Sequence, residues 1–546
     1  MISKRVFISV LTSAALILWL FSIHGARVQI QEGLGEFGLF SVMPPFFLVS
    51  LSLLSISFLL NLKTRERSNK LFFCQIILLI LFLNLTPIIV EGTARFNTSY
   101  QNYRAVSYIL QTGHIDPLVQ WIHNWPSFSI LFSIFMEITI LPETILLSIY
   151  PTLFSIALFF PLFMLFRSVL NDNWLVWIAL WTFYISNWIG QEYFSMQSLG
   201  LLAFVLILAI VFKLTDSQIS ARKIAVLLLL FFYVVTSHML SSLMVVAVFL
   251  SLFTSMHPKK PVFAAYFVLI FAAWTVFGAA EYFESNLGAF VAEVFDLQLI
   301  LRANLTSRIS GSAAHVTVTQ VSLFFSFAIS ILALSGLVLV WKKKKMRRTD
   351  RKFLLTLTGL FSLIGLASYG GEIFLRVFLF GLIPLSYFVA RASYNKVFLG
   401  VLAVFLVVAA PSLNIVAHYG NEVTQYVPPS ELEGIEFFYK ETTHGYVITS
   451  YLVGSNSLYR DFRYRESYQY FELSSTEWKN NMLSAVSIER EQPKFVFITY
   501  GMREFYDFLL GDPQFLAEIG RNLSESTYYD KFYSNPSFES YVELQP

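Results

Sequence analysis

The chain has 546 residues, of which 56% are hydrophobic and only 13% are charged. A soluble domain usually carries about 25% charged residues, so this composition excludes an ordinary soluble protein and indicates a membrane protein. The net charge of +3 gives no basis for binding nucleic acid. Cys74 is the only cysteine, which excludes an internal disulfide and a cysteine-based metal site.

Long apolar runs recur along the chain up to residue 417. Backbone amides cannot stay unpaired in lipid, so such runs must be helices. The first run is long for a signal peptide and no clear cleavage site follows it, so we expect a retained helix. The fold class is therefore mostly α, a polytopic membrane helix bundle of about thirteen transmembrane helices. These spans are predicted at residues 6–23, 40–62, 71–90, 143–166, 174–189, 197–213, 224–237, 239–256, 261–280, 321–341, 353–369, 373–390 and 397–417.

The placement of lysine and arginine predicts the orientation of this bundle, residues 1–417. Basic clusters occupy every second loop, and such clusters stay on the cytoplasmic side of a membrane. This rule places the N-terminus in the cytoplasm. The apolar run 126–141 would reach only ~24 Å as a helix, and a crossing there would reverse every later loop. We expect it to be a half-inserted element of a long outer loop, 91–142, and a second outer loop covers 281–320.

Residues 418–546 are predicted to form a small extracytoplasmic α/β domain, because charged residues become frequent after His418. The order Ser430-Glu431-Leu432-Glu433 fits a capping box that opens a helix running towards Lys440. The other expected elements are strands at 446–451 and 494–499, a helix at 503–510 and a final strand at 540–544.

Three predicted hairpins have unusually short legs, 174–189/197–213, 224–237/239–256 and 353–369/373–390. Such legs reach roughly 21–27 Å, so their outer turns should lie below the membrane surface. Polar groups at that depth need water or partners. We therefore predict a polar cavity that opens to the outside. Its candidate substrate-binding residues are Glu192, Tyr193, Gln197, His238, Glu372 and Arg376.

The first outer loop carries three further candidates. Glu91 stands at the outer end of the third span, where a carboxylate can act as general base on an acceptor hydroxyl or simply end a helix. His114 and Asp116 lie in a turn and are candidates for binding a phosphate or a cation, although this pattern is also ordinary turn chemistry. His123 is expected at the surface.

Arginine is the residue of choice for binding phosphate, because its planar guanidinium suits that geometry better than ammonium does. Arg376 lies four residues after Glu372 and so on the same helical face, which allows either a neutralising ion pair or a phosphate site. Arg302 and Arg308 form a second candidate anion clamp. Simple solvation of their loop is the favoured interpretation.

Taken in order, these segments resemble the GT-C superfamily of membrane glycosyltransferases, in particular prokaryotic members related to the dolichyl-phosphate-mannose protein mannosyltransferases. The resemblance rests on the loop after Glu91 and on the short hairpin turns. Its matching segments are Ser107–His114, Asn124-Trp125-Pro126, Glu192–Gln197, Ser237-His238 and Arg376–Phe380. This chain departs from the family pattern in having Asn97-Thr98-Ser99 where an aspartate is expected, and in two extra spans before the loop.

The resemblance implies an outward-facing cavity in a multi-pass protein of the plasma membrane. There a sugar would move from a polyprenyl-phosphate-linked donor to a glycan or protein acceptor, with Glu91 as the catalytic carboxylate. The implied partners are the sugar lipid, the acceptor and membrane lipids. No cofactor is certain, and a divalent cation is a candidate.

Two other functions fit the same sequence features. A carrier or flippase for a lipid-linked sugar needs the cavity but no base. A non-catalytic cell-envelope assembly protein would instead use residues 418–546 to bind a partner. Replacement of Glu91 by glutamine separates the enzyme from the carrier, because only the enzyme needs the carboxylate.

Overall fold

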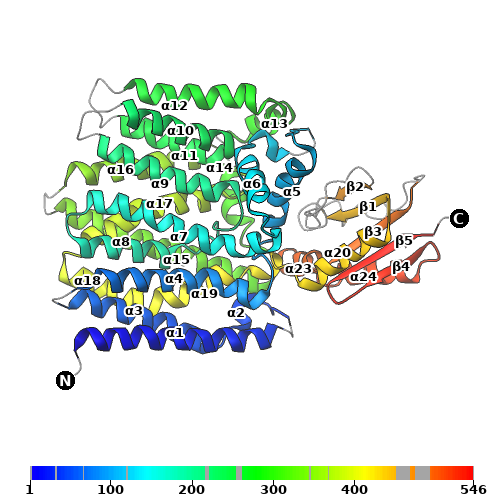
Figure 1. Cartoon of the computed structure of the whole chain (residues 1–546), viewed down its shortest axis with the longest axis horizontal. Coiled ribbons are helices and arrows are strands. Elements are labelled where there is room, and N and C mark those ends of the chain that lie inside the picture. Colours follow the sequence, from blue (N-terminus) through cyan, green and yellow to red (C-terminus); the bar gives the residue numbers. More distant parts are fainter. Residues whose placement is uncertain are drawn as a thin grey trace.

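The computed structural model describes most of the chain. The described residues are 3–30, 33–64, 67–118, 121–214, 221–253, 261–294, 296–342, 346–366, 368–450, 468–473 and 492–544. Helices lie side by side in a bundle, and a small sheet domain projects from one end of it (Figure 1).

Each predicted span overlaps a helix of the bundle, although several of the bounds differ. The bundle helices are α1 (Lys4–Gln29), α3 (Pro45–Lys63), α4 (Asn69–Glu91), α7 (Glu143–Val169), α8 (Asn173–Ser186), α9 (Met196–Leu214), α10 (Ala221–Ser237), α11 (Met239–Phe253), α12 (Pro261–Ala273), α15 (Ala313–Lys342), α16 (Arg348–Ser362), α17 (Ile373–Ala392) and the series α18 (Lys396–Val404), η6 (Phe405–Ala409) and α19 (Ala410–Tyr419). The helices form where predicted because their apolar runs leave the backbone no other way to satisfy its hydrogen bonds in lipid.

Several of these helices are short for a membrane span. Among the described residues, eight helices are long and apolar enough to cross a membrane, or nine if one bent pair counts as a single span. In the predicted hairpins, α8 has 14 residues and α11 has 15. The chain is therefore a multi-pass membrane protein, and the exact number of crossings stays a prediction.

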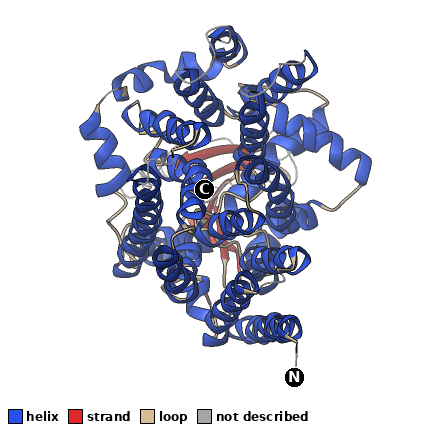
Figure 2. Cartoon of the chain, turned by 90° about the vertical axis from the view of Figure 1, so that its left-hand side faces the viewer, coloured by secondary structure: helices blue, strands red, loops and turns tan. Residues whose placement is uncertain are grey.

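The N-terminus and the sheet domain lie at opposite ends of the bundle (Figure 1). Successive bundle helices run in opposite directions, so the turns at 170–172 and 393–395 lie at the N-terminal end. Seen end-on, the strands lie behind the middle of the bundle (Figure 2). This alternation matches the predicted order of loops, and which end faces the cytoplasm stays a prediction.

The two predicted outer loops lie at the sheet end of the bundle (Figure 1). The first contains α5 (Asn97–Thr112), η2 (Trp121–Asn124) and the short apolar helix α6 (Ser127–Thr139). The second follows a sharp bend of 86° after α12. Its elements are η3 (Trp274–Gly278), α13 (Ala280–Glu293), α14 (Leu297–Leu301) and η4 (Arg302–Thr306). Smaller segments at this end are α2 (Leu39–Val42), η5 (Leu363–Gly365) and η7 (Glu422–Thr424).

The C-terminal sheet has five strands in the order β2-β1-β3-β5-β4. Strand β1 pairs in parallel with β2 and β3, whereas β5 pairs antiparallel with β3 and β4. The strands are β1 (Gly445–Ser450), β2 (Tyr468–Leu473), β3 (Lys494–Thr499), β4 (Tyr529–Ser534) and β5 (Phe538–Glu543). The helical segments are α20 (Pro429–Glu441), α23 (Tyr500–Glu504), η9 (Phe505–Leu509) and α24 (Phe515–Glu525). The predicted mixed α/β elements are thus present.

Strand β3 is buried along its whole length, because helices cover both faces of the sheet. Val496 and Ile498 point to the core shared with α23 and α24, whereas Phe495 and Phe497 pack against α20. Successive side chains of β3 point to opposite faces of the sheet, and both faces are covered, so the middle residues of the strand are all apolar.

The predicted capping box at Ser430 is wrong. The N-cap is Pro428, two residues before Ser430, so the helix begins at Pro429, and no side chain caps it. Proline suits the first helical position because its fixed φ matches the helix. Ser430 therefore lies inside the first turn, where its Oγ instead donates to the Oγ of Ser537 across 2.7 Å.

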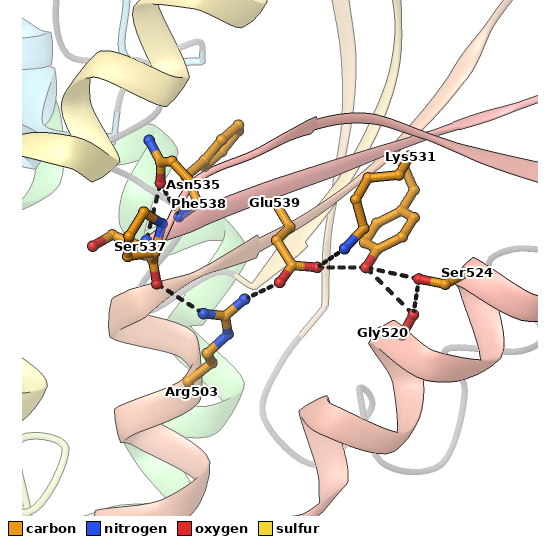
Figure 3. A network of polar contacts seen from close by, with 10 residues as sticks. Arg503, Gly520, Ser524, Lys531, Asn535, Ser537, Phe538 and Glu539 are labelled. Carbon is orange, nitrogen blue, oxygen red and sulfur yellow. Dashed lines mark hydrogen bonds and ion pairs between the residues drawn. The ribbon is translucent and has the colours of Figure 1, made fainter.

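Figure 3 shows the polar network that ties α23 and α24 to strands β4 and β5 of the sheet. Nη2 of Arg503 donates to Oε1 of Glu539 across 2.6 Å, and its Nη1 reaches the carbonyl of Pro536. Nζ of Lys531 lies 3.2 Å from Oε2 of Glu539, which also accepts from the hydroxyl of Tyr541. The network fixes one face of the sheet and lies apart from the polar groups of the bundle.

Candidate functional site

Buried polar groups gather at the sheet end of the bundle in two clusters. The loop between α8 and α9 contributes to both, through neighbouring residues 192 and 193. The Arg95 cluster consists of Glu91, Arg95, Glu192, His418 and Glu422. The Arg376 cluster consists of Tyr193, His238, Arg308, Tyr369, Glu372 and Arg376.

Arg95 uses its whole guanidinium within the protein. Its Nε donates to Oε1 of Glu422 across 2.6 Å, and its Nη2 reaches both Oε2 of Glu422 and the carbonyl of His418. Its Nη1 lies 2.7 Å from Nε2 of His418. The rings of Phe96 and Tyr419 flank the group. Because all three of its guanidinium nitrogens are engaged within the protein, Arg95 is a structural anchor.

Glu91 lies beside this anchor without joining it. The residue is 3% exposed, and neither carboxylate oxygen has a hydrogen-bond partner among the described residues. It is the last residue of α4, where the helix dipole disfavours a negative charge. An unpaired carboxylate of this kind in a buried position calls for a functional explanation.

Glu192 occupies the same cluster and is also incompletely paired. Nδ2 of Asn187 donates to its Oε1, whereas its Oε2 is buried without a partner among the described residues. Burial raises the pKa of Glu192, and the positive charge of Arg95 opposes that effect. The prediction that this hairpin turn carries buried polar groups is therefore correct.

Arg376 is the centre of the second cluster. It pairs with Glu372 one turn earlier, yet its Nε and Nη1 are buried with no partner among the described residues. Its side chain is 8% exposed, whereas that of Glu372 is 42% exposed, so the cluster reaches solvent at this carboxylate. Burial raises the pKa of Glu372, but Arg376 and Arg308 outweigh it and the net shift is downward. The carboxylate is therefore ionised, and Arg376 retains free donors.

His238 is a neutral member of this cluster. Its Nδ1 accepts from the backbone N–H of Ser241, so its Nε2 carries the proton that faces the hydroxyl of Tyr369 at 3.4 Å. Burial, together with the charge of Arg376, lowers the pKa of His238 to about 3. Burial likewise raises the pKa of Tyr193 to about 12. The polar neighbours of Arg376 are thus uncharged apart from Glu372 and Arg308.

Arg308 joins the cluster from the second outer loop. Its Nε donates to the carbonyl of Gly371 across 2.8 Å, next to Glu372. Burial lowers the pKa of Arg308, with Glu372 opposing and Arg376 adding to that effect. The favoured interpretation, that this arginine only solvates its loop, is wrong for Arg308. Arg302 is exposed, and its role stays a prediction. Nothing in the sequence signals that the loop folds back onto α17.

The other predicted site residues lie elsewhere. His114 is exposed and contacts the hydroxyl of Tyr108, and Asp116 caps the N–H of Leu118. His123, expected at the surface, is instead 1% exposed and bridges residues 105 and 116. Gln197 is buried, and its Nε2 has no partner among the described residues. His114 and Asp116 therefore belong to neither cluster.

An apolar cavity of about 330 Å³ adjoins the Arg376 cluster. Tyr369 belongs to both, and Ile373 and Met239 lie next to cluster residues in the chain. Other walls are formed by Leu243, Phe271 and Leu366. An acidic head group beside Arg376 and a hydrocarbon chain in this cavity would satisfy both surfaces.

The described part of the chain contains no cluster of side chains suited to bind a metal ion. No group of three or more His, Cys, Asp or Glu side chains there is placed to hold a metal ion. The divalent cation considered from the sequence therefore stays a prediction without an assigned site.

No family model and no curated protein matches the sequence. The fold is similar to that of the oligosaccharyltransferase of Archaeoglobus fulgidus in its apo form, with a TM-score of 0.51, 11% identity, and 88% of this chain and 75% of that chain covered. A structure of this enzyme tethered to an acceptor peptide with the NVT sequon has a TM-score of 0.48 and 11% identity, with 87% of this chain and 74% of that chain covered. The archaeal oligosaccharyltransferase AglB from the same organism, in complex with an inhibitory peptide and a dolichol-phosphate, has a TM-score of 0.48 and 12% identity. The match covers 87% of this chain and 74% of that chain.

The likeness to the apo enzyme establishes the fold. The chain shares the fold of this enzyme over most of its length, which agrees with the GT-C-like fold that the resemblance in sequence implied. An identity of 11% carries no information about the reaction, which depends on the residues of the site.

Proposed function

We propose that this chain is a membrane glycosyltransferase that moves a sugar from a polyprenyl-phosphate-linked donor to an acceptor on the outer side of the membrane. One observation carries the proposal. Arg376 keeps two buried donor atoms that no described residue of the protein pairs, beside an apolar cavity, in a GT-C-like fold. A lipid phosphate would supply an acceptor for these two donor atoms, because phosphate accepts strong hydrogen bonds from guanidinium. The hydrocarbon chain of the lipid would fill the apolar cavity.

In this proposal Arg376 stabilises the leaving group. The acceptor oxygen attacks the anomeric carbon of the donor as the bond from that carbon to the phosphate oxygen breaks. The released polyprenyl phosphate keeps the bonding electrons and gains negative charge, which a preorganised guanidinium stabilises. Attack from the opposite face inverts the anomeric centre.

Glu91 is the proposed general base, which takes the proton of the acceptor hydroxyl. Neither of its oxygens has a hydrogen-bond partner in the part of the chain that the structure describes, which supports this role, because a base needs a free lone pair within about 3 Å of the acceptor oxygen. The described contacts place Glu91 with Arg95 and not with Arg376. The role therefore requires the acceptor to approach Glu91 between the two clusters, near residues 192 and 193.

A carrier for a lipid-linked sugar is the second candidate function. The separate position of Glu91 favours it, because the Arg376 cluster and its cavity would bind the same lipid without any base.

The deciding experiment compares E91Q with wild type in cells that lack the chromosomal copy. Mass spectrometry of lipid-linked sugars and surface glycans should show one accumulated sugar lipid in the deletion strain. Wild type should clear it and E91Q should not, whereas E137Q, at an exposed position on α6, should act as wild type. Normal glycans with E91Q would remove the base assignment, and an unchanged lipid pool in the deletion strain would reject the transferase itself.

A further inference from the structure

The Arg376 cluster contains two guanidinium groups and one carboxylate. Arg376 binds Glu372 through Nη2, and Arg308 contacts the same turn through its bond to the carbonyl of Gly371. The charges of Arg308 and Arg376 both act on Glu372. His238, Tyr193 and Tyr369 contribute no charge. Summed over its described members, the cluster therefore carries one positive charge in excess.

The position of Arg308 is fixed by a set of contacts between the second outer loop and the turn before α17. Oδ1 of Asn304 accepts from the N–H of Phe374, and its Nδ2 donates to the carbonyl of Ser368. The hydroxyl of Ser368 also donates to Glu293 across 2.6 Å. Asn304 is 1% exposed. These buried contacts hold the loop against α17, so the position of Arg308 in the site is fixed by the fold.

The backbone of the turn is shaped to allow this approach. Gly371 has a φ of +79°, and a Cβ at this position would lie 2.8 Å from the carbonyl oxygen of Ala303. Tyr369 is also in the left-handed region, with φ of 51°. A non-glycine residue rarely adopts that conformation unless its surroundings impose it. The turn therefore brings Arg308, Glu372 and the ring of Tyr369 together beside the apolar cavity.

The charge of the cluster distinguishes between the two common classes of lipid-linked sugar donor. A sugar joined through one phosphate is a phosphodiester with one negative charge, and a sugar joined through a diphosphate carries two. A single positive charge neutralises the first. The second would leave a negative charge without a partner in a mostly buried site, which is costly.

We propose that Arg308 and Arg376 together form a clamp for a singly charged phosphodiester, and that this clamp selects a polyprenyl monophosphate donor over a polyprenyl diphosphate donor. Arg308 is the specificity-determining residue contributed by the second outer loop. The identity of the lipid rests on the proposed function, whereas the charge of the bound group rests on the cluster alone.

The test measures binding to the full-length protein in nanodiscs at low and constant salt. The probes are a polyprenyl phosphomonosaccharide, the corresponding diphosphate, inorganic phosphate and inorganic pyrophosphate. Wild type should bind the monophosphate lipid about tenfold or more tightly than the diphosphate lipid. R308Q should weaken monophosphate binding about ten- to a hundredfold, because it removes a charge-assisted contact.

Two matched variants sharpen the result. E372Q adds one net positive charge, so it should shift the preference towards the diphosphate lipid. R302Q removes an exposed arginine of the same loop and should bind as wild type. Equal affinity of wild type for both lipids, or an R308Q variant that binds as wild type while remaining folded by circular dichroism, would overturn the proposal.

The soluble probes distinguish a lipid site from a free phosphate site. Inorganic phosphate should compete only at concentrations at least about a hundredfold above those of the lipid, because it cannot fill the cavity. Equal competition would overturn the assignment to a lipid. If the lipid preference holds but no sugar transfer occurs, the proposed transferase fails and the clamp stands. If transfer occurs without any effect of R308Q, the clamp alone fails.

Discussion

Nε of Arg95 lies 2.6 Å from Oε1 of Glu422, although 327 residues separate the two in the chain. The pair joins the start of the first outer loop to the segment that leaves the bundle for the sheet domain. Two adjacent backbone contacts reinforce it: Oγ1 of Thr93 donates to the carbonyl of Val427, and the N–H of Asn97 donates to the carbonyl of Gln425. Both charges are almost completely buried. The base of the loop that carries Glu91 is thus set by the last residues of the bundle.

Loss of either partner of this pair should destabilise the bundle strongly. E422Q leaves the Arg95 charge buried without its counter-ion, which costs about 3–5 kcal/mol. Thermal unfolding in detergent should show a lower midpoint for E422Q and for R95M. The double variant should lose less than the sum of the two, because each single change removes the same interaction. Additive losses would show that the pair contributes no coupling.

A second buried pair, at the N-terminal end of the bundle, should matter for stability and not for the site. Asp350 is fully buried, lies 3.1 Å from Nε of Arg391 and accepts from the hydroxyl of Tyr387 across 2.6 Å. D350N should cost about 3–5 kcal/mol, and Y387F about 1 kcal/mol. Folded D350N should still bind the donor lipid as wild type does, measured in the same nanodiscs. Altered lipid affinity would mean that the two ends of the bundle are coupled.

The turn before α17 offers a matched pair of glycine variants. Gly370 and Gly371 both have positive φ, but an added Cβ meets nothing within 4 Å at Gly370 and lies 2.8 Å from Ala303 O at Gly371. G370A should cost about 1–2 kcal/mol for the left-handed backbone alone. G371A should also displace the loop that carries Arg308, and so weaken monophosphate binding about tenfold or more. Equal lipid affinities for the two variants would contradict this account.

The sheet domain should become less stable as the pH rises towards neutrality. Burial, with Asp507 nearby, raises the pKa of Glu504 to about 7, although Arg503 opposes the shift. Between the ordinary carboxyl pKa near 4.3 and this value, the unfolded chain loses its proton while the folded domain keeps it. The unfolded state then binds fewer protons, so the free energy of unfolding falls with pH in that window.

E504Q should abolish most of this pH dependence. The variant cannot ionise, so it should be on the order of 1–2 kcal/mol more stable than wild type at pH 8 and about equal to it at pH 4. Urea-dependent cleavage of the sheet domain of the full-length protein, followed at several pH values, measures the difference. A wild-type profile that stays flat between pH 4 and pH 8 would contradict the shifted carboxyl pKa.

The candidate site was predictable only in part. The short hairpins predicted that their turns would lie at one depth, and in the structure Tyr193, His238 and Glu372 lie near Arg376. Glu91 and Glu192 belong to a neighbouring cluster instead. Contacts across the bundle decide which turns face each other, and hydropathy does not encode them.

The amino-acid sequence by itself determined the helices, their alternating direction and the mixed α/β tail. The physical reason is that lipid forces each apolar run to satisfy its own backbone hydrogen bonds, so secondary structure there is a local property. Only the tertiary structure decided that Arg95 meets Glu422, that Arg308 folds onto the turn of Gly371, and that the carboxylate of Glu91 accepts no hydrogen bond from any residue in the described ranges. Those contacts depend on which of many equally apolar helices become neighbours, and side-chain packing makes that choice.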